Sequence, residues 1–129
     1  MPTLKKFEDL DVWKDARELA KEIYLLTQQE SFKNDIHLID QIREIAIRIP
    51  NFIAKGVESN NHDEFIKSLE SAKIACTELY TLFAIIVEIK AIDSDEKIKF
   101  ETLIDNLLLK ISSLINYLQP NQHNQHKPD

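Results

Sequence analysis

The stretch from Gln41 to Gly56, QIREIAIRIPNFIAKG, constrains the fold of this chain more than any other. Its apolar residues recur at steps of three and four, which places them on one face of a helix. Pro50 lies in the middle, where a proline removes a backbone hydrogen bond at a typical cost of about 3 kcal/mol. Packing must therefore hold the segment helical, and we expect a helix bent at Pro50. Gly56 is predicted to end it, because glycine readily adopts the left-handed conformation of helix ends.

The rest of the chain predicts an all-α fold. One glycine and four prolines in 129 residues are too few for the frequent turns of a sheet. The pairs Asn61/Glu64 and Asp93/Glu96 have the spacing of reciprocal N-terminal caps. Periodicity then predicts an antiparallel up-down-up-down four-helix bundle. Its expected parts are an extended lead-in at 1–10, helices at about 11–28, 35–57, 63–91 and 93–118, and a disordered polar tail at 119–129.

The third and fourth predicted helices carry more apolar residues than one bundle core requires. On the fourth, the core stripe is expected to be Phe100, Leu103, Leu107, Ile111, Leu114 and Leu118. Surplus apolar surface usually marks a site where a partner binds, so we predict a homo-oligomer joined through these two helices. The alternative is a monomer with scattered exposed apolar residues. The predicted oligomer interface consists of Ile74, Leu82, Ile85, Ile104, Leu108 and Ile115.

Charge and cysteine content limit the class of protein. Sixteen basic and twenty-two acidic residues give a formal charge of −6, which opposes general binding to nucleic acid. The N-terminal residues lack the apolar core of a signal peptide, and no run is long enough to span a membrane. The single cysteine, Cys76, suits a reducing compartment. These features predict a cytoplasmic protein.

No residues form a pattern typical of catalysis or of cofactor or metal binding. Bundles that hold two metal ions use Glu-x-x-His repeats, and this chain has none. One glycine cannot form a glycine-rich phosphate loop. Cys76 lies on the predicted core stripe, where a cysteine usually acts as a small buried apolar residue. We therefore predict no catalytic, cofactor-binding or metal-binding residue and no enzymatic activity.

Basic residues form the one candidate site for nucleic acid or a nucleic-acid-bound protein. Arg48 and Lys55 are seven residues apart and share a helix face. Arg43 has two interpretations: it faces a ring lumen or binds phosphate, or it caps or braces a neighbouring chain through Glu78 or Glu88, and we favour the second. The residues of this alternative function are Lys14, Arg17, Lys21, Arg43, Arg48 and Lys55.

The order of several motifs resembles a known family. These are FEDLDVW at 7–13, IYLLT at 23–27, QIREIAIRIPNFIAKG at 41–56, EF at 64–65 and EL at 78–79. Together they resemble the bacterial four-helix-bundle proteins called 23S rRNA intervening-sequence proteins, over about residues 7–118. The family's central motif reads like QLRRAAxSIPxNIAEG. Its matches in this chain are Gln41, Arg43, Ala46, Ile49, Pro50, Ile53, Ala54 and Gly56.

The resemblance implies a non-enzymatic four-helix bundle that assembles into a ring, typically a homopentamer. Similar proteins accompany the reverse transcriptases of diversity-generating retroelements, where a basic surface engages nucleic acid and the transcriptase. This chain departs from the motif at Glu44, where the family has a second arginine, and at Arg48, Phe52 and Lys55. Glu44 lowers the expected affinity for phosphate, which rests on accumulated positive charge.

Overall fold

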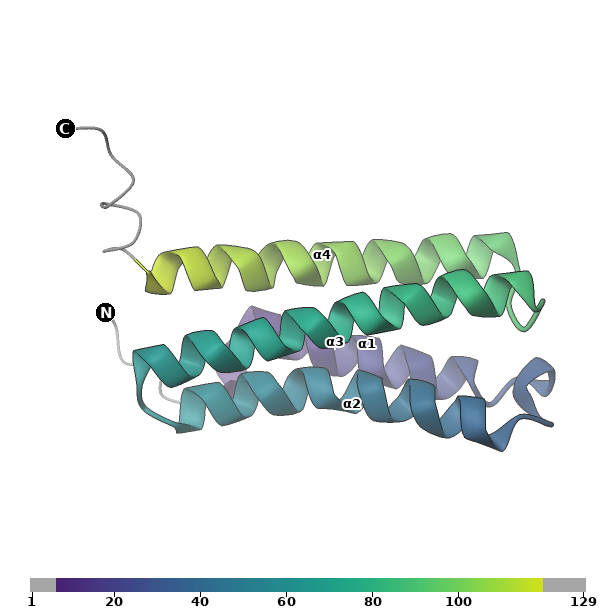
Figure 1. Ribbon diagram of the computed structural model, residues 1–129, viewed down its shortest axis with the longest axis horizontal. Coiled ribbons are helices and arrows are strands. Elements are labelled where there is room, and N and C mark those ends of the chain that lie inside the picture. The colour runs from purple at the N-terminus through teal and green to yellow at the C-terminus, as the bar shows by residue number, and fades with distance from the viewer. Residues whose placement is uncertain (1–6, 120–129) are drawn as a thin grey trace.

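The computed structural model describes residues 7–119 of the chain. Within them it is all-helical and contains no strand, which confirms the predicted all-α class. Its elements are η1 (Phe7–Asp9), α1 (Asp11–Leu26), η2 (Glu30–Phe32), α2 (Ile36–Glu58), α3 (His62–Glu88) and α4 (Ser94–Leu118). In Figure 1 the four long helices lie side by side, and each runs opposite to the one before it.

The ends of the chain differ in part from expectation. Residues 7–9 form a short 3-10 helix rather than the predicted extended lead-in. The Phe7 ring packs edge-on against Trp13 with 5.2 Å between centroids, and this aromatic contact holds the turn against α1. The remainder of the lead-in, 1–6, and the predicted disordered tail from 120 onward lie outside the described residues.

The helices begin and end where the side chains can satisfy the backbone. At the start of α3, the Asn61 side chain accepts a hydrogen bond from the Glu64 amide at 2.9 Å. At the start of α4, Asp93 and Glu96 form both halves of a capping box, as predicted. The α3 helix ends with Lys90 in the left-handed conformation, at φ 64°, and with the Ala91 amide donating to the Ile86 carbonyl at 2.9 Å. These signals fix the helix bounds.

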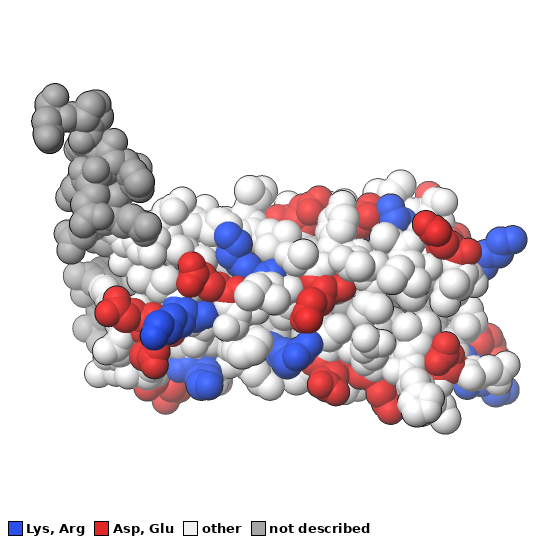
Figure 2. Space-filling model, viewed as in Figure 1, with Lys and Arg blue, Asp and Glu red and all other residues white. Residues whose placement is uncertain are grey.

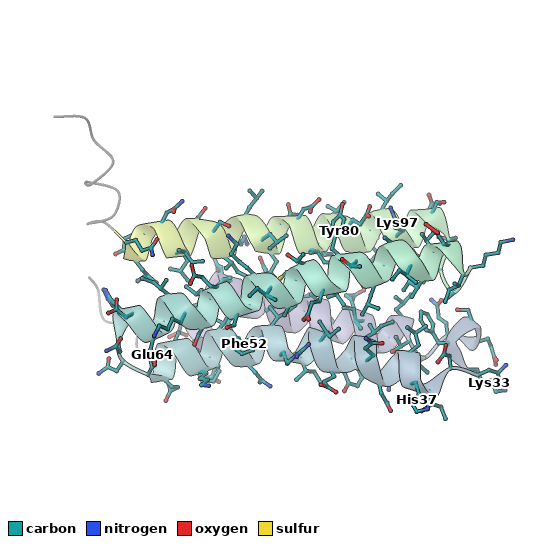
Figure 3. All side chains as sticks on the ribbon, in the orientation of Figure 1. Lys33, His37, Phe52, Glu64, Tyr80 and Lys97 are labelled. Atoms are coloured by element: carbon teal, nitrogen blue, oxygen red, sulfur yellow. The ribbon has the colours of Figure 1, made fainter. Side chains whose placement is uncertain are left out.

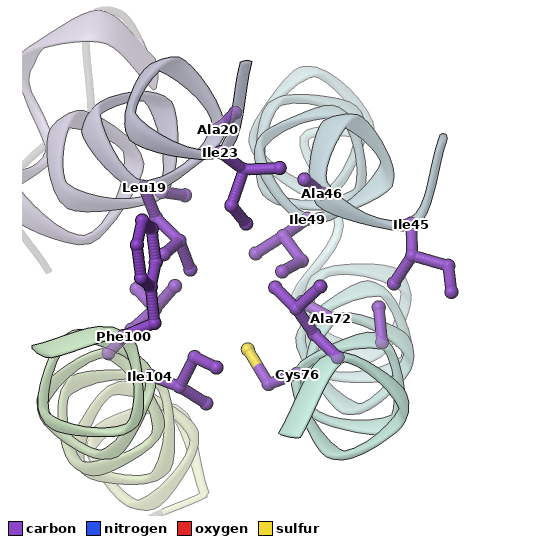
Figure 4. Packing of buried hydrophobic residues seen from close by; sticks show 14 of the residues in the cluster. Leu19, Ala20, Ile23, Ile45, Ala46, Ile49, Ala72, Cys76, Phe100 and Ile104 are labelled. Carbon is purple, nitrogen blue, oxygen red and sulfur yellow. The ribbon is translucent and has the colours of Figure 1, made fainter. Parts of the chain in front are cut away.

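A single core joins the four helices. Figure 4 looks along the bundle and shows side chains from α1, α2, α3 and α4 meeting at its centre, among them Ile23, Ile49, Cys76 and Ile104. These four side chains are fully buried. The Phe83 and Phe100 rings stack at 4.8 Å and join α3 to α4. This core supplies the apolar burial that stabilises helices of this length.

The α2 helix continues unbroken through Pro50, as expected for a segment held by packing. Ile49 and Ile53, on either side of the proline, have no exposed surface. The bend at Pro50 stays a prediction. Gly56, by contrast, does not end the helix: it lies inside α2 and is buried, with no positive φ. The left-handed residue after α2 is Asn60, at φ 53°.

The role of Gly56 is to let α2 and α3 approach closely. A Cβ atom at this position would lie 2.7 Å from Phe65 Cδ1, 3.0 Å from Ser68 Cβ and 3.3 Å from Phe65 Cα. Atoms do not pack at the shortest of these distances without displacing a neighbour. Glycine is therefore required by the space between two helices rather than by backbone conformation.

Candidate interaction surface on α3 and α4

Four large aliphatic side chains are exposed on the outer faces of α3 and α4. They are Ile74 (63% exposed) and Ile85 (49%) on α3, and Ile98 (59%) and Leu109 (68%) on α4. Within each helix the two residues are eleven apart, which is close to three turns and places them on one line. Each helix thus carries an apolar line on the side that faces away from the core.

The stacked rings of Phe83 and Phe100 show which residues of α3 and α4 lie at the same height along the bundle. Ile74 lies nine residues before Phe83, and Leu109 lies nine residues after Phe100. Because neighbouring α3 and α4 run in opposite directions, these two residues lie at about the same height along the bundle (Figure 1). Ile85 and Ile98, each two residues from its phenylalanine, share a second level.

A polar seam separates the two apolar lines. Lys97 and Glu101 of α4 form an ion pair at 2.8 Å, and Tyr80 of α3 lies beside them (Figure 3). The carboxylates of Glu101 and Asp105, together with partial burial, raise the pKa of the Tyr80 hydroxyl. The candidate surface therefore consists of two separate apolar lines with charges between them, not one continuous apolar patch.

A hollow lies on the outer face of α3. Its lining includes Ile74, Thr77, Glu78 and Thr81, and most of its surface is apolar. The Thr77 hydroxyl donates to the Lys73 carbonyl and the Thr81 hydroxyl to the Thr77 carbonyl, both at 3.1 Å. Because both hydroxyls bond to carbonyls of their own helix, these two short side chains lie close to the helix surface.

The structure corrects part of the predicted oligomer interface. Ile104 is 0% exposed and Ile115 is 8% exposed, so both lie in the core of the single chain and not on the outer surface where the prediction placed them. Leu82 and Leu108 are half-buried against that core. Ile74 and Ile85 are exposed on α3, where the prediction placed them. The error on α4 arose because its buried face is rotated toward α3: Leu103 and Leu114, which we expected in the core, are only half-buried.

Sequence reasoning missed the two exposed residues of α4, Ile98 and Leu109. Both lie off the predicted core stripe, Ile98 between two lysines and Leu109 at the end of the leucine run 107–109. Their eleven-residue spacing, which places them on one line of a helix, was the available signal. The outer line of α4 could have been found from that spacing.

Arg43 contacts the C-terminal end of α1 in its own chain. Its Nε donates to Thr27 Oγ1 at 2.8 Å, and its guanidinium carbon lies 4.5 Å from the centre of the Tyr24 ring. Thr27 in turn donates to the Ile23 carbonyl at 2.9 Å. Arg43 thus caps the C-terminus of α1, where a positive charge is favourable. The predicted contact of Arg43 with Glu78 or Glu88 of a neighbouring chain stays a prediction.

Most of the other predicted cations also have partners within the chain. Arg48 Nη2 contacts Glu78 Oε1 at 3.2 Å, between α2 and α3. Lys21 pairs with Glu18 at 2.6 Å, and the Arg17 guanidinium lies over the Trp13 ring at 5.1 Å. Among the described residues Lys14 and Lys55 form no ion pair, and both are exposed.

The basic residues do not gather into one patch on the face that Figure 2 shows. There, Lys and Arg side chains are interspersed with Asp and Glu. Phosphate binding depends on the number of cations that act together. Acidic neighbours reduce the local positive potential, so this arrangement favours a mixed-charge surface over a nucleic-acid groove.

The comparison with known families gives the identity. The family model described as 23S rRNA-intervening sequence protein matches residues 8–116. The chain belongs to this family. The match begins in η1, includes α1, α2 and α3 and ends within α4, so it covers the bundle almost completely. No curated protein matches the sequence.

The 23S rRNA-intervening sequence proteins are not a known enzyme family. Within residues 7–119 of this member, no three His, Cys, Asp or Glu side chains gather in a way that could hold a metal ion. None of the helices described combines the length and apolar character needed to cross a bilayer. Burial raises the pKa of the Cys76 thiol to about 12, which disfavours the reactive thiolate.

Proposed function

We propose that this 23S rRNA-intervening sequence protein is a non-enzymatic cytoplasmic scaffold that associates with itself through the outer faces of α3 and α4. The observation that carries the proposal is the pair of apolar lines, Ile74/Ile85 and Ile98/Leu109, which face away from the core at two shared levels. Large aliphatic side chains exposed in register along two helices are typical of protein contact surfaces. The resemblance to the family implies a ring, typically a homopentamer.

The size of the two faces supports a ring in which each copy makes two contacts. The α3 and α4 helices have 27 and 25 residues, so each is about 40 Å long and about 10 Å wide. One helix face can therefore bury about 400 Å². A standard interface buries about 800 Å² per partner, so a contact between one α4 face and one α3 face is small. A closed ring, in which every copy makes two such contacts, is therefore favoured over an open pair.

Light scattering at micromolar concentration tests the proposal. The single chain has a mass of 15.0 kDa, and five copies would give about 75 kDa. We expect a mass several times that of the chain, since each copy loses two exposed apolar lines to its neighbours. A mass of one chain at this concentration would exclude the self-associating scaffold.

Nucleic-acid binding is the alternative function. The observation in its favour is that the side chains of Lys14 and Lys55 are exposed and form no ion pair among the described residues. Against it, Arg17, Lys21, Arg43 and Arg48 contact groups of their own chain. Retention of structured RNA at low salt that falls steeply as salt is raised would support it. No retention at low salt would exclude it.

A further inference from the structure

The α3 hollow has the geometry of a coiled-coil acceptor site. Ile74, Thr77, Glu78 and Thr81 occupy positions i, i+3, i+4 and i+7 of the helix. Four residues at these positions form the hole that receives one side chain of a facing helix in knobs-into-holes packing. We call these four residues the α3 hole. The hollow is open to solvent and, at about 600 Å³, has room for a large aliphatic group, and Ile74 makes one wall apolar.

Leu109 has the form of the matching knob. It is the most exposed of the large apolar residues described, at 68%. Its helical neighbours three and four positions away are short and polar, so its side chain stands above the surrounding surface. These neighbours are Asp105, Asn106, Ser112 and Ser113.

The α3 hole and Leu109 of the same chain cannot meet. Ile74 and Leu109 lie at about the same height, but the two helices are neighbours in one bundle and both faces point outward. A second chain must therefore supply the knob. Because the two surfaces differ, the contact is heterologous, which leads to a closed ring when the rotation closes.

Charges beside the two surfaces are complementary. Glu78 lies on the side of the α3 hole that faces α2, as its contact with Arg48 shows. Lys110, next to the knob, lies on the side of α4 that faces α1, as its contact with Asp15 shows. In Figure 4, α1 and α2 lie on the same side of the pair formed by α3 and α4. Two copies side by side in the same orientation therefore bring Lys110 of one beside Glu78 of the other.

We propose that Leu109 of one copy inserts into the α3 hole of the next copy, with Lys110 beside Glu78. This inference rests on the proposed self-association and specifies its contact. Leu109 is the central anchor, a position where truncation typically weakens binding about 30-fold or more. The charged pair then sets which way the neighbouring copy faces.

Two variants test the inference, each with one surface disabled. Leu109→Gln removes the knob and keeps the α3 hole, whereas Thr77→Arg fills the hole and keeps the knob. Both positions are exposed, so each variant should melt at nearly the wild-type temperature, which circular dichroism checks. Matched controls on the other helices are Leu25→Gln on α1, where the leucine is 54% exposed, and Asn51→Arg on α2.

We expect each variant alone to have the mass of one chain, while both controls assemble like the wild type. An equimolar mixture of the two variants should form a dimer of about 30 kDa, twice the chain mass of 15.0 kDa, because one intact knob meets one intact hole. A mixture that stays monomeric, or variants that assemble like the wild type, would overturn the heterologous contact while self-association stands. A monomeric wild type would overturn both.

Discussion

The seam between α2 and α3 differs from the seam between α1 and α4. At the first, Gly56 lets the backbone of α2 approach Phe65 so closely that no Cβ fits between them. At the second, the helices approach less closely and are bridged at the surface by the ion pairs Glu22/Lys99 and Asp15/Lys110. Close packing depends on each methyl group, whereas exposed ion pairs contribute little. We therefore expect stability to depend on the first seam far more than on the second.

Gly56→Ala, in the seam between α2 and α3, should cause the largest loss of stability. The added methyl group meets Phe65 at 2.7 Å, and overpacking of this kind costs about 1–3 kcal/mol. Alanine's better helix propensity returns up to about 1 kcal/mol, so a net loss of about 1–2 kcal/mol is expected in urea unfolding. Phe65→Leu should make room for the methyl group. If the losses of Gly56→Ala and Phe65→Leu simply add in the double variant, the two sites are not coupled as proposed.

Thr27→Val tests the seam between α1 and α2, where we expect a loss of stability between those of the other two seams. Valine keeps the shape of the buried threonine but removes the oxygen that accepts from Arg43 Nε at 2.8 Å. Leaving a donor without its partner costs about 1 kcal/mol when the donor retains some access to water. Thr27→Ser keeps the oxygen and is the control. A Val variant as stable as the wild type would show that the Arg43 cap contributes nothing to the fold.

Glu22→Gln tests the open seam. Its hydrogen bond to Lys99, at 2.9 Å, lowers the pKa of the Glu22 carboxyl below its usual 4.5. A carboxyl whose pKa is lower when folded stabilises the protein above its unfolded pKa and loses this contribution as the pH falls through the folded pKa. The side chain is partly exposed, so we expect a loss of no more than about 0.5 kcal/mol at pH 7. The wild type and the variant should become equally stable at low pH; a difference that persists there would point to packing instead.

Lys90→Gly should produce the smallest change, and in the opposite direction. Lys90 ends α3 at φ 64°, a conformation that costs a residue with a Cβ more than it costs glycine. After allowing for the greater freedom of glycine in the unfolded chain, we expect a gain of a few tenths of a kcal/mol. Asn60→Gly, at φ 53°, should gain less because asparagine tolerates this region better. A loss of stability on Lys90→Gly would show that its side chain matters more than its backbone.

Local sequence signals predicted the helices well because they act within one or two turns. The cap at Asp93 and Glu96 is present as expected, and Cys76 is buried in the core, as its place on the predicted stripe indicated. Periodicity identifies an apolar face of a helix, but when apolar residues cover more than one face it does not determine which face turns inward.

The candidate surface was predicted less well than the fold for that reason. Ile104 and Ile115 were assigned to the outside because Leu103 and Leu114 were assigned to the core, and the actual rotation of α4 reverses this order. The function of Gly56 and the partner of Arg43 depend on a second helix that lies elsewhere in the sequence. No spacing within one helix contains that information.

Cys76 can report how often the bundle opens, because its side chain is buried in the core. The thiol has no exposed surface, and burial raises its pKa to about 12, so little reactive thiolate forms while the core is closed. Labelling at this single sulfur therefore requires the helices to separate, so its rate under native conditions reports how often the core opens. The same measurement on an assembled and a dissociated sample would show whether neighbours restrain that motion.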